Sequence, residues 1–277
     1  MDAYILSLTI FVAINVALAL SLNLISGFCG QISLGHAAFY GTGAYVSAIL
    51  SVSGVPFAVS FVAGGIAAGI LGFLVGLASL RVREDFLAIT TMGVNFLFVG
   101  FVRKQGWLGG EIGITAIPKP MSDAGMATLA WILVAATAFL LVAIRRSWLG
   151  TGFTMIAQDE QAATSLGLNV GRFKLAAFVM GTAAAGMAGV IYAHVAQLIV
   201  PDAFGFVVSI SILAMVVVGG IGSIFGVILG AVLLTLLPEL ARFANDYKLL
   251  IFGALMVAVM LISPGGLAGA FQRLRAR

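Results

Sequence analysis

Long uncharged apolar runs recur along the whole chain of 277 residues, and they limit the possible folds more than any other feature. A membrane span needs about 20 mainly apolar residues to cross roughly 30 Å of hydrocarbon. Hydrophobic residues make up 62% of the sequence and charged residues only 9%, whereas a soluble domain carries about 25% charged residues. The alternating segments typical of a membrane β-barrel are absent. We therefore expect one all-α domain over residues 1–277, a polytopic transmembrane helix bundle.

The apolar runs predict about eight or nine spans. They are expected near residues 4–25, 34–53, 55–80, 86–102, 127–145, 173–197, 206–221, 224–240 and 248–263. The run over residues 206–240 is too long for one span, and the glycines at 219, 220 and 222 offer a place to break it.

Basic residues predict the orientation of these spans. With nine spans, nine basic residues fall on one side, and five fall on the other, namely Arg103, Lys104, Lys119, Arg242 and Lys248. The nine are Arg81, Arg83, Arg145, Arg146, Arg172, Lys174, Arg273, Arg275 and Arg277. Because basic residues accumulate on the cytoplasmic side of a membrane, we expect the N-terminus outside and the C-terminus in the cytoplasm.

The sequence carries few of the patterns that catalysis requires. It has no G-x-x-x-x-G-K-[ST] phosphate loop, and His36 and His194 have no cysteine or carboxylate at metal-ligand spacing. No dense basic patch with interleaved aromatic residues indicates nucleic-acid binding. Ionisable residues are almost absent from the predicted spans, which leaves His36 as the candidate for proton coupling. We expect a solute pathway without its own energy source, and no enzyme, metal or cofactor site in this chain.

Uncharged polar residues enter the predicted membrane region. An amide in lipid is costly unless it is satisfied, so each such residue should face a partner helix or a wet cavity. One interpretation is hydrogen bonding between helices. The other is that some of them line the path of a solute. The candidates for that path are Asn23, Gln31, Ser33, His36 and Asn95.

Residues 146–172 form the predicted cytoplasmic loop, which contains a short helix. Asp159 and Glu160 would stand in its first turn, where negative charge suits the helix dipole. Gly167 is well placed to end it in a left-handed conformation. A protein partner could grip such a helix, although an ordinary helix on the membrane surface explains the pattern equally well. The candidate docking residues are Asp159, Glu160, Gln161, Ala162, Ala163 and Gly167.

The small residues of this helix leave little bulk on its surface. Ile156, Ala163 and Leu166 are expected to form its small apolar face.

Several motifs resemble one known family. Residues 27–39 read G-F-C-G-Q-I-S-L-G-H-A-A-F, which is similar to the G-x-x-G-Q-I-S-L-G-H-A-A-F signature of permeases in branched-chain amino acid-type ATP-binding-cassette importers. The resemblance extends from about residue 17 to residue 269 and includes residues 202–206, 219–223 and 264–267. Residues 161–167 resemble the E-A-A-x-x-x-G docking loop, with Gln161 where Glu is usual. Residues 108–114 resemble the T-G-G-x-x-G-I element of one of the two permease types, with Leu108 where Thr is usual.

The resemblance implies a fold, an activity and an assembly. It implies a permease in the bacterial inner membrane, paired with a second related permease subunit, usually as a heterodimer. Two ATP-binding subunits, which hold the ATP and Mg²⁺, would dock on the cytoplasmic loops, and a periplasmic binding protein would deliver the solute. Branched-chain amino acids are the first choice of solute, and urea, short amides and aromatic acids are alternatives. A secondary transporter or a channel remains the alternative class.

Overall fold

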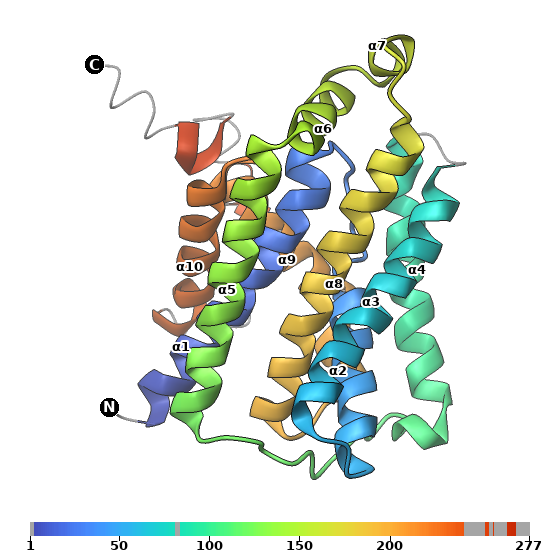
Figure 1. Cartoon of the computed structure of the whole chain (residues 1–277). Coiled ribbons are helices and arrows are strands. Elements are labelled where there is room, and N and C mark those ends of the chain that lie inside the picture. The colour runs from blue at the N-terminus through green and yellow to red at the C-terminus, as the bar shows by residue number, and fades with distance from the viewer. Residues whose placement is uncertain (1–2, 81–83, 241–252, 255–256, 258–264, 270–277) are drawn as a thin grey trace.

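The computed structural model describes residues 3–80, 84–240, 253–254, 257 and 265–269. These residues form a bundle of long helices, with short helices at its two ends (Figure 1). The elements in chain order are α1 (Ala3–Leu22), η1 (Asn23–Phe28), α2 (His36–Val52), α3 (Phe57–Ser79), α4 (Glu84–Lys104), η2 (Gly106–Leu108), α5 (Asp123–Arg146), α6 (Trp148–Gln158), α7 (Glu160–Ser165), α8 (Val170–Ala196), η3 (Pro201–Phe204), α9 (Phe206–Gly219) and α10 (Ile224–Leu240).

The short helices α6 and α7 distinguish one end of the bundle from the other. Helices α6 and α7 lie together at one end, which we call the α7 end, while α1 starts at the opposite end (Figure 1). The loop between α4 and α5 also runs across the opposite end (Figure 1). There it is tied to the segment after α8, because Ile114 and Ile199 exchange two backbone hydrogen bonds of 3.0 Å.

Six helices of the described part of the chain are long and apolar enough to cross a membrane. They occupy Tyr4–Phe28, Phe57–Ala78, Phe86–Lys104, Asp123–Arg146, Val170–Ala196 and Pro201–Gly219. The all-α membrane bundle is thus confirmed, whereas the count of eight or nine spans is not. Helices α2 and α10, with 17 residues each, are shorter than the six. The span expected at residues 248–263 lies outside the described residues apart from 253–254 and 257.

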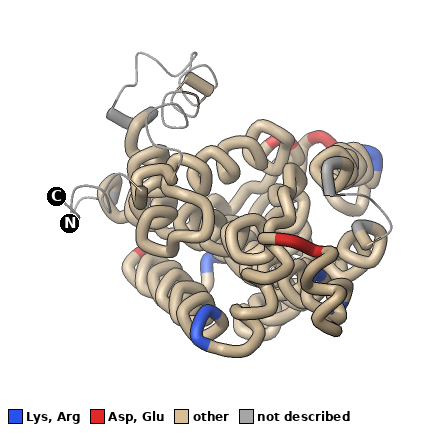
Figure 2. Tube along the Cα trace, turned by 90° about the horizontal axis from the view of Figure 1, so that it is seen from above, with Lys and Arg blue, Asp and Glu red and all other residues tan. Residues whose placement is uncertain are grey.

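Apolar side chains on the bundle surface require a lipid environment. Ile66, Ile70 and Leu74 are each 57% exposed along one stripe of α3. Leu97 on α4 is 73% exposed, and Phe139 on α5 is 74% exposed. Charged residues are few, and most of the helical surface carries none (Figure 2). Because a soluble monomer rarely exposes such continuous apolar surface, these faces are suited to hydrocarbon.

Small residues bring the central helices α2, α3 and α8 into close contact. A Cβ atom added at Gly72 of α3 would lie 2.0 Å from Oγ1 of Thr182 on α8. One added at Gly43 of α2 would lie 2.1 Å from the carbonyl oxygen of Gly186, also on α8. Membrane helices that pack through small residues gain contacts between their backbones. The glycine spacing of the sequence therefore serves helix packing here.

Two interruptions of helical structure lie near the α7 end. The first break comprises residues 29–35, between η1 and α2, and the second break comprises residues 220–223, between α9 and α10. Helix η1, which directly precedes the first break, contacts the second break, since Asn23 Oδ1 accepts a hydrogen bond of 2.9 Å from the backbone N–H of Gly222. Non-helical backbone inside a membrane is stable only where other groups satisfy it.

Candidate functional site

Groups on three other helices bond to residues in and directly after the first break. The Leu34 N–H donates to Thr91 Oγ1 of α4 at 2.9 Å, and the Ala37 N–H donates to Ser209 Oγ of α9 at 2.9 Å. The amide Nε2 of Gln31 donates to the main-chain oxygen of Lys174 on α8 at 3.2 Å. These bonds hold residues 29–35 in a defined shape that does not depend on helical hydrogen bonding.

His36 begins α2 directly after the first break, and its side chain is fully buried. Its Nε2 lies 2.7 Å from Ser21 Oγ. The single hydroxyl hydrogen of Ser21 is donated to the Leu18 carbonyl at 2.8 Å. This arrangement suits the tautomer with the hydrogen on Nε2 of His36, in which Nδ1 is an acceptor. No described residue donates a hydrogen bond to that Nδ1.

Asn95 lies on the face of α4 that also carries Thr91, one turn earlier, because residues four apart share a helix face. Thr91 holds the first break, and Asn95 Nδ2 donates a hydrogen bond of 3.0 Å to the Phe204 carbonyl of η3. The Phe204 ring is surrounded by aromatic rings with centroids 5.1–6.4 Å away. Those rings belong to Tyr40, Tyr45, Phe98 and Tyr192. This face of α4 thus connects the first break to an aromatic cluster.

The five candidate path residues share one property. Each is buried, at 2% exposure or less, and each keeps one side-chain polar atom without a hydrogen-bond partner among the described residues. Those atoms are Asn23 Nδ2, Gln31 Oε1, Ser33 Oγ, His36 Nδ1 and Asn95 Oδ1. Three of the five residues lie in or directly after the first break, whereas Asn23 bonds to the second break and Asn95 lies at the aromatic cluster.

Two more buried residues have the same property, and the sequence reasoning missed both. They are Tyr45 and Ser47 of α2, whose hydroxyl oxygens lack a partner among the described residues. Nothing in their sequence context marked them, because a single Tyr or Ser in an apolar run is most simply read as packing.

The expected docking segment consists of two helices at the α7 end (Figure 1). Helix α6 ends at Gln158, and Asp159 is the N-cap of α7. Its Oδ1 accepts hydrogen bonds from the backbone N–H groups of Gln161 at 2.8 Å and Ala162 at 2.9 Å. Gly167 has a φ of +85°, so the predicted left-handed end of the helix is confirmed.

Burial divides the candidate docking residues. Asp159, Gln161, Ala162 and Gly167 are exposed, whereas Ala163 is 1% exposed and packs inward. The predicted apolar face of Ile156, Ala163 and Leu166 is wrong in one member, since Leu166 is 72% exposed. Leu166 is the C-cap residue after Ser165, where α7 ends before the left-handed Gly167, so its side chain does not continue the inward face of Ala163.

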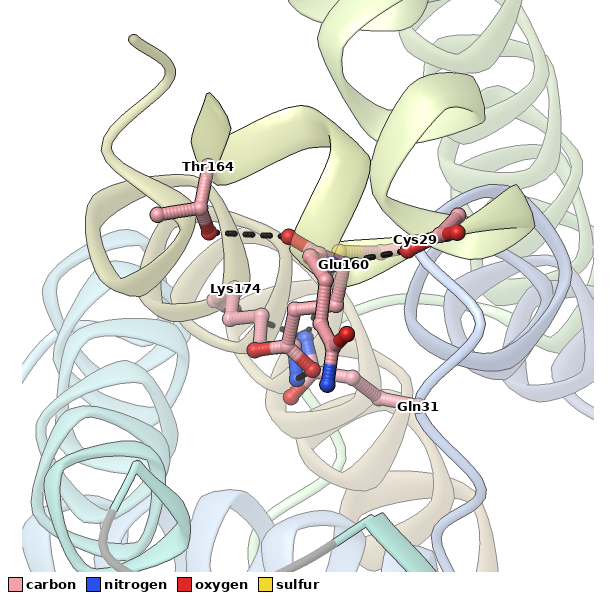
Figure 3. A network of polar contacts seen from close by, with 7 residues as sticks. Cys29, Gln31, Glu160, Thr164 and Lys174 are labelled. Atoms are coloured by element: carbon pink, nitrogen blue, oxygen red, sulfur yellow. Dashed lines mark hydrogen bonds and ion pairs between the residues drawn. The ribbon is translucent and has the colours of Figure 1, made fainter. Parts of the chain in front are cut away.

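Helix α7 is attached to the bundle by an ion pair. The Lys174 Nζ atom donates to Glu160 Oε2 at 2.6 Å, and the Lys174 side chain is only 10% exposed (Figure 3). Sequence reasoning counted Lys174 only as a basic residue beside a span. Its partner could not be recognised from spacing, because 14 residues separate the two side chains.

Comparisons with known proteins extend over nearly the whole chain. The sequence profile of the family described as "Branched-chain amino acid transport system / permease component" matches residues 4–260. The chain is 35% identical to the high-affinity branched-chain amino acid transport system permease protein LivM of Escherichia coli (strain K12), over 92% of this chain and 67% of that relative. It is 28% identical to the corresponding permease protein LivH of Salmonella typhimurium (strain LT2), over 91% of this chain and 90% of that relative.

A solved structure, PsaBC from Streptococcus pneumoniae in complex with Fab, superposes with a TM-score of 0.50. The superposition covers 97% of this chain and 94% of that one at 14% sequence identity, so it bears on the fold alone. The identity with LivM exceeds that with LivH. The matched region includes both breaks and the α6–α7 pair. The chain therefore belongs to the family of permease components of branched-chain amino acid transport systems, as its sequence motifs predicted.

Proposed function

We propose that this chain is the membrane-spanning permease subunit of an ATP-driven importer in a bacterial inner membrane. Its solute would be a branched-chain amino acid or a related small polar molecule delivered by a periplasmic binding protein. The observation that carries the proposal is helix α7, a capped six-residue helix presented at one end of the bundle with small and polar residues exposed. The family membership supports the same conclusion.

The docking surface is formed by Asp159, Glu160, Gln161, Ala162 and Gly167, while Ala163 packs beneath it. A cleft in an ATP-binding subunit can accept such a short helix, whose exposed side chains are small or polar up to Leu166 at its C-terminal end. Two such subunits, which supply ATP and Mg²⁺, and a second related permease complete the assembly. This chain itself holds no cofactor in that scheme.

The α7 end faces the cytoplasm, and the N-terminus lies outside. Arg145 and Arg146 in the last turn of α5 stand at the α7 end, which agrees with the accumulation of basic residues on the cytoplasmic side. A cysteine placed at exposed Gln161 should react with a membrane-impermeant maleimide only in inside-out vesicles. Cys29, the single native cysteine, is buried and gives a low background. Labelling in right-side-out cells would contradict this orientation.

Asn23, Gln31, Ser33, His36 and Asn95 contribute to the solute path. Their unpaired atoms include the amide donor of Asn23 and the acceptors of Gln31 and Asn95, which suit a solute that carries both an ammonium and a carboxylate. Alanine at Asn23, Gln31 and Asn95 together should abolish uptake, whereas alanine at exposed Thr128 should not. Unchanged uptake in the triple variant would remove these residues from the path.

Purification of the tagged chain from its native membrane tests the assembly. A nucleotide-binding subunit and a second permease should co-purify, and solute-loaded binding protein should raise ATP hydrolysis by the complex. Solute flux through the purified chain alone would favour a channel or a secondary carrier. A response to urea, amides or aromatic acids in place of leucine would keep the importer and change its solute.

A further inference from the structure

Lys174 connects the docking helix to the first break through both its side chain and its main chain. Its Nζ atom donates to Glu160 Oε2 of α7 at 2.6 Å, while its carbonyl oxygen accepts from Gln31 Nε2 at 3.2 Å. Figure 3 shows these groups converging from α7, α8 and the first break. One residue thus bonds to the proposed docking surface and also to the proposed solute path.

Further hydrogen bonds hold the partners of Lys174 on each side. On the docking side, Glu160 is the first residue of a helix whose next two backbone N–H groups are held by Asp159. On the path side, the Gln31 carbonyl accepts from Ser26 Oγ at 2.9 Å, and the Gln31 N–H donates to the Ile25 carbonyl at 3.1 Å. Through these bonds the side chains of Lys174 and Gln31 connect α7 to the first break and to η1.

A second contact runs parallel to this one. Gly30 has a φ of +74° and lies against α6, where a Cβ atom added to it would stand 3.1 Å from Ala157 Cα. The last turn of α6 and the first turn of α8 thus both touch the first break, at neighbouring residues. Of these two contacts, only the one through Lys174 includes a charged pair, in which the Lys174 side chain is 10% exposed and the Glu160 side chain 39% exposed.

We propose that Lys174 is a positioning residue that couples movement of the docking helix to the shape of the first break. This inference rests on the proposed function, in which ATP-binding subunits move α7. The buried position of Lys174 favours this role over a surface ion pair, because an exposed pair contributes little and breaks easily. Removing one partner of a buried pair, by contrast, leaves a charge poorly compensated.

The test uses the complete complex, reconstituted with its ATP-binding subunits, second permease and binding protein. Lys174→Met keeps the length of the side chain and removes its charge. We expect the ATP-binding subunits to co-purify as before, while the number of ATP molecules hydrolysed per solute imported rises roughly twofold to thirtyfold, the range over which single residues modulate coupling. Arg172→Met is the matched control, since Arg172 lies two residues earlier on α8 with an exposed side chain.

A double-variant cycle separates coupling from mere support of the fold. Gln31→Leu breaks the path side of the link and should raise the same ratio. Because both substitutions interrupt one link, the double variant should be no worse than the more affected single variant. Effects that multiply in the double variant would overturn the proposal.

The remaining outcomes are also decisive. An unchanged number of ATP molecules hydrolysed per solute in Lys174→Met would overturn the proposal. It would also be overturned if Lys174→Met no longer co-purified with the ATP-binding subunits while Gln31→Leu kept a normal ratio of ATP hydrolysed to solute imported. A native ratio of ATP hydrolysed to solute imported in Lys174→Arg, which keeps the charge, would support the proposal. If the unmodified chain bound no ATP-binding subunit, the proposed function itself would fail. That failure can be told apart from failure of the Lys174 proposal, because it is seen before any substitution is made.

Discussion

The contact between η1 and the second break can be tested at Gly27, which lies in η1 beside Gly222. The substitution Gly27→Ala would place a methyl group 2.0 Å from Asn23 Oδ1 and 2.6 Å from the backbone nitrogen of Gly222. Ordinary contacts between such atoms are about 3.5–4.0 Å. The side chain of Asn23 can rotate, but the Gly222 backbone cannot, so η1 and the second break must move apart.

The cost has two parts. Overpacking of a close contact destabilises a protein by about 1–3 kcal/mol. Loss of the bond between Asn23 and Gly222 adds about 1 kcal/mol. For a chain of this length each kcal/mol lowers the Tm by roughly 2–4 °C, so we expect the Tm to fall by roughly 4–16 °C.

The assay is thermal unfolding of the purified complex in lipid nanodiscs, together with solute uptake by the same preparation in proteoliposomes. Gly100→Ala is the control, because Gly100 is exposed on α4 and a Cβ atom there would meet nothing within 4 Å. The control should match or slightly exceed the native Tm, since Ala favours a helix over Gly. A Tm for Gly27→Ala equal to that of the control would refute the claimed contact.

Three further outcomes are expected. Gly167→Val places a branched residue at φ +85°, which costs about 1–2 kcal/mol and should lower solute uptake per ATP hydrolysed. The control Gly106→Val should have no effect on uptake, and equal uptake in both variants would contradict the docking assignment. Asn95→Leu removes the donor to the Phe204 carbonyl and should destabilise the complex by about 1–3 kcal/mol in denaturant or thermal unfolding. A variant as stable as the native complex would show that this hydrogen bond contributes nothing to stability. Asp202→Asn weakens the exposed ion pair with Arg103 and should change stability by less than about 1 kcal/mol, so a large loss in the same assay would indicate a role in gating.

Much of the fold could be predicted from hydropathy, because each span buries its backbone hydrogen bonds internally and needs only apolar length. The expected segments 55–80 and 173–197 correspond closely to Phe57–Ser79 and Val170–Ala196. Segment 34–53 corresponds to α2 (His36–Val52), but α2 is not among the six helices long enough to cross a membrane. The chain enters α2 through residues 29–35, which have no helical structure, so α2 has only 17 residues. An apolar run does not reveal where Thr91 and Ser209 will replace helical hydrogen bonds.

The candidate site was predictable in part. The unusual amides Asn23, Gln31 and Asn95 stood out because polar groups are scarce in this sequence, and all three are buried. Their partners were not predictable. Asn23 pairs with Gly222, 199 residues away, and Gln31 pairs with Lys174, 143 residues away. Helical or strand periodicity carries no information about contacts at that separation.

The most direct test of the proposed function is solute uptake by proteoliposomes that contain this chain with its ATP-binding subunits, second permease and binding protein. Uptake of a radiolabelled branched-chain amino acid would be measured with ATP or a non-hydrolysable analogue inside. The account predicts accumulation above the external concentration only with ATP, and none when the ATP-binding subunits are omitted. Equal flux with the analogue, or flux through this chain without those subunits, would contradict it.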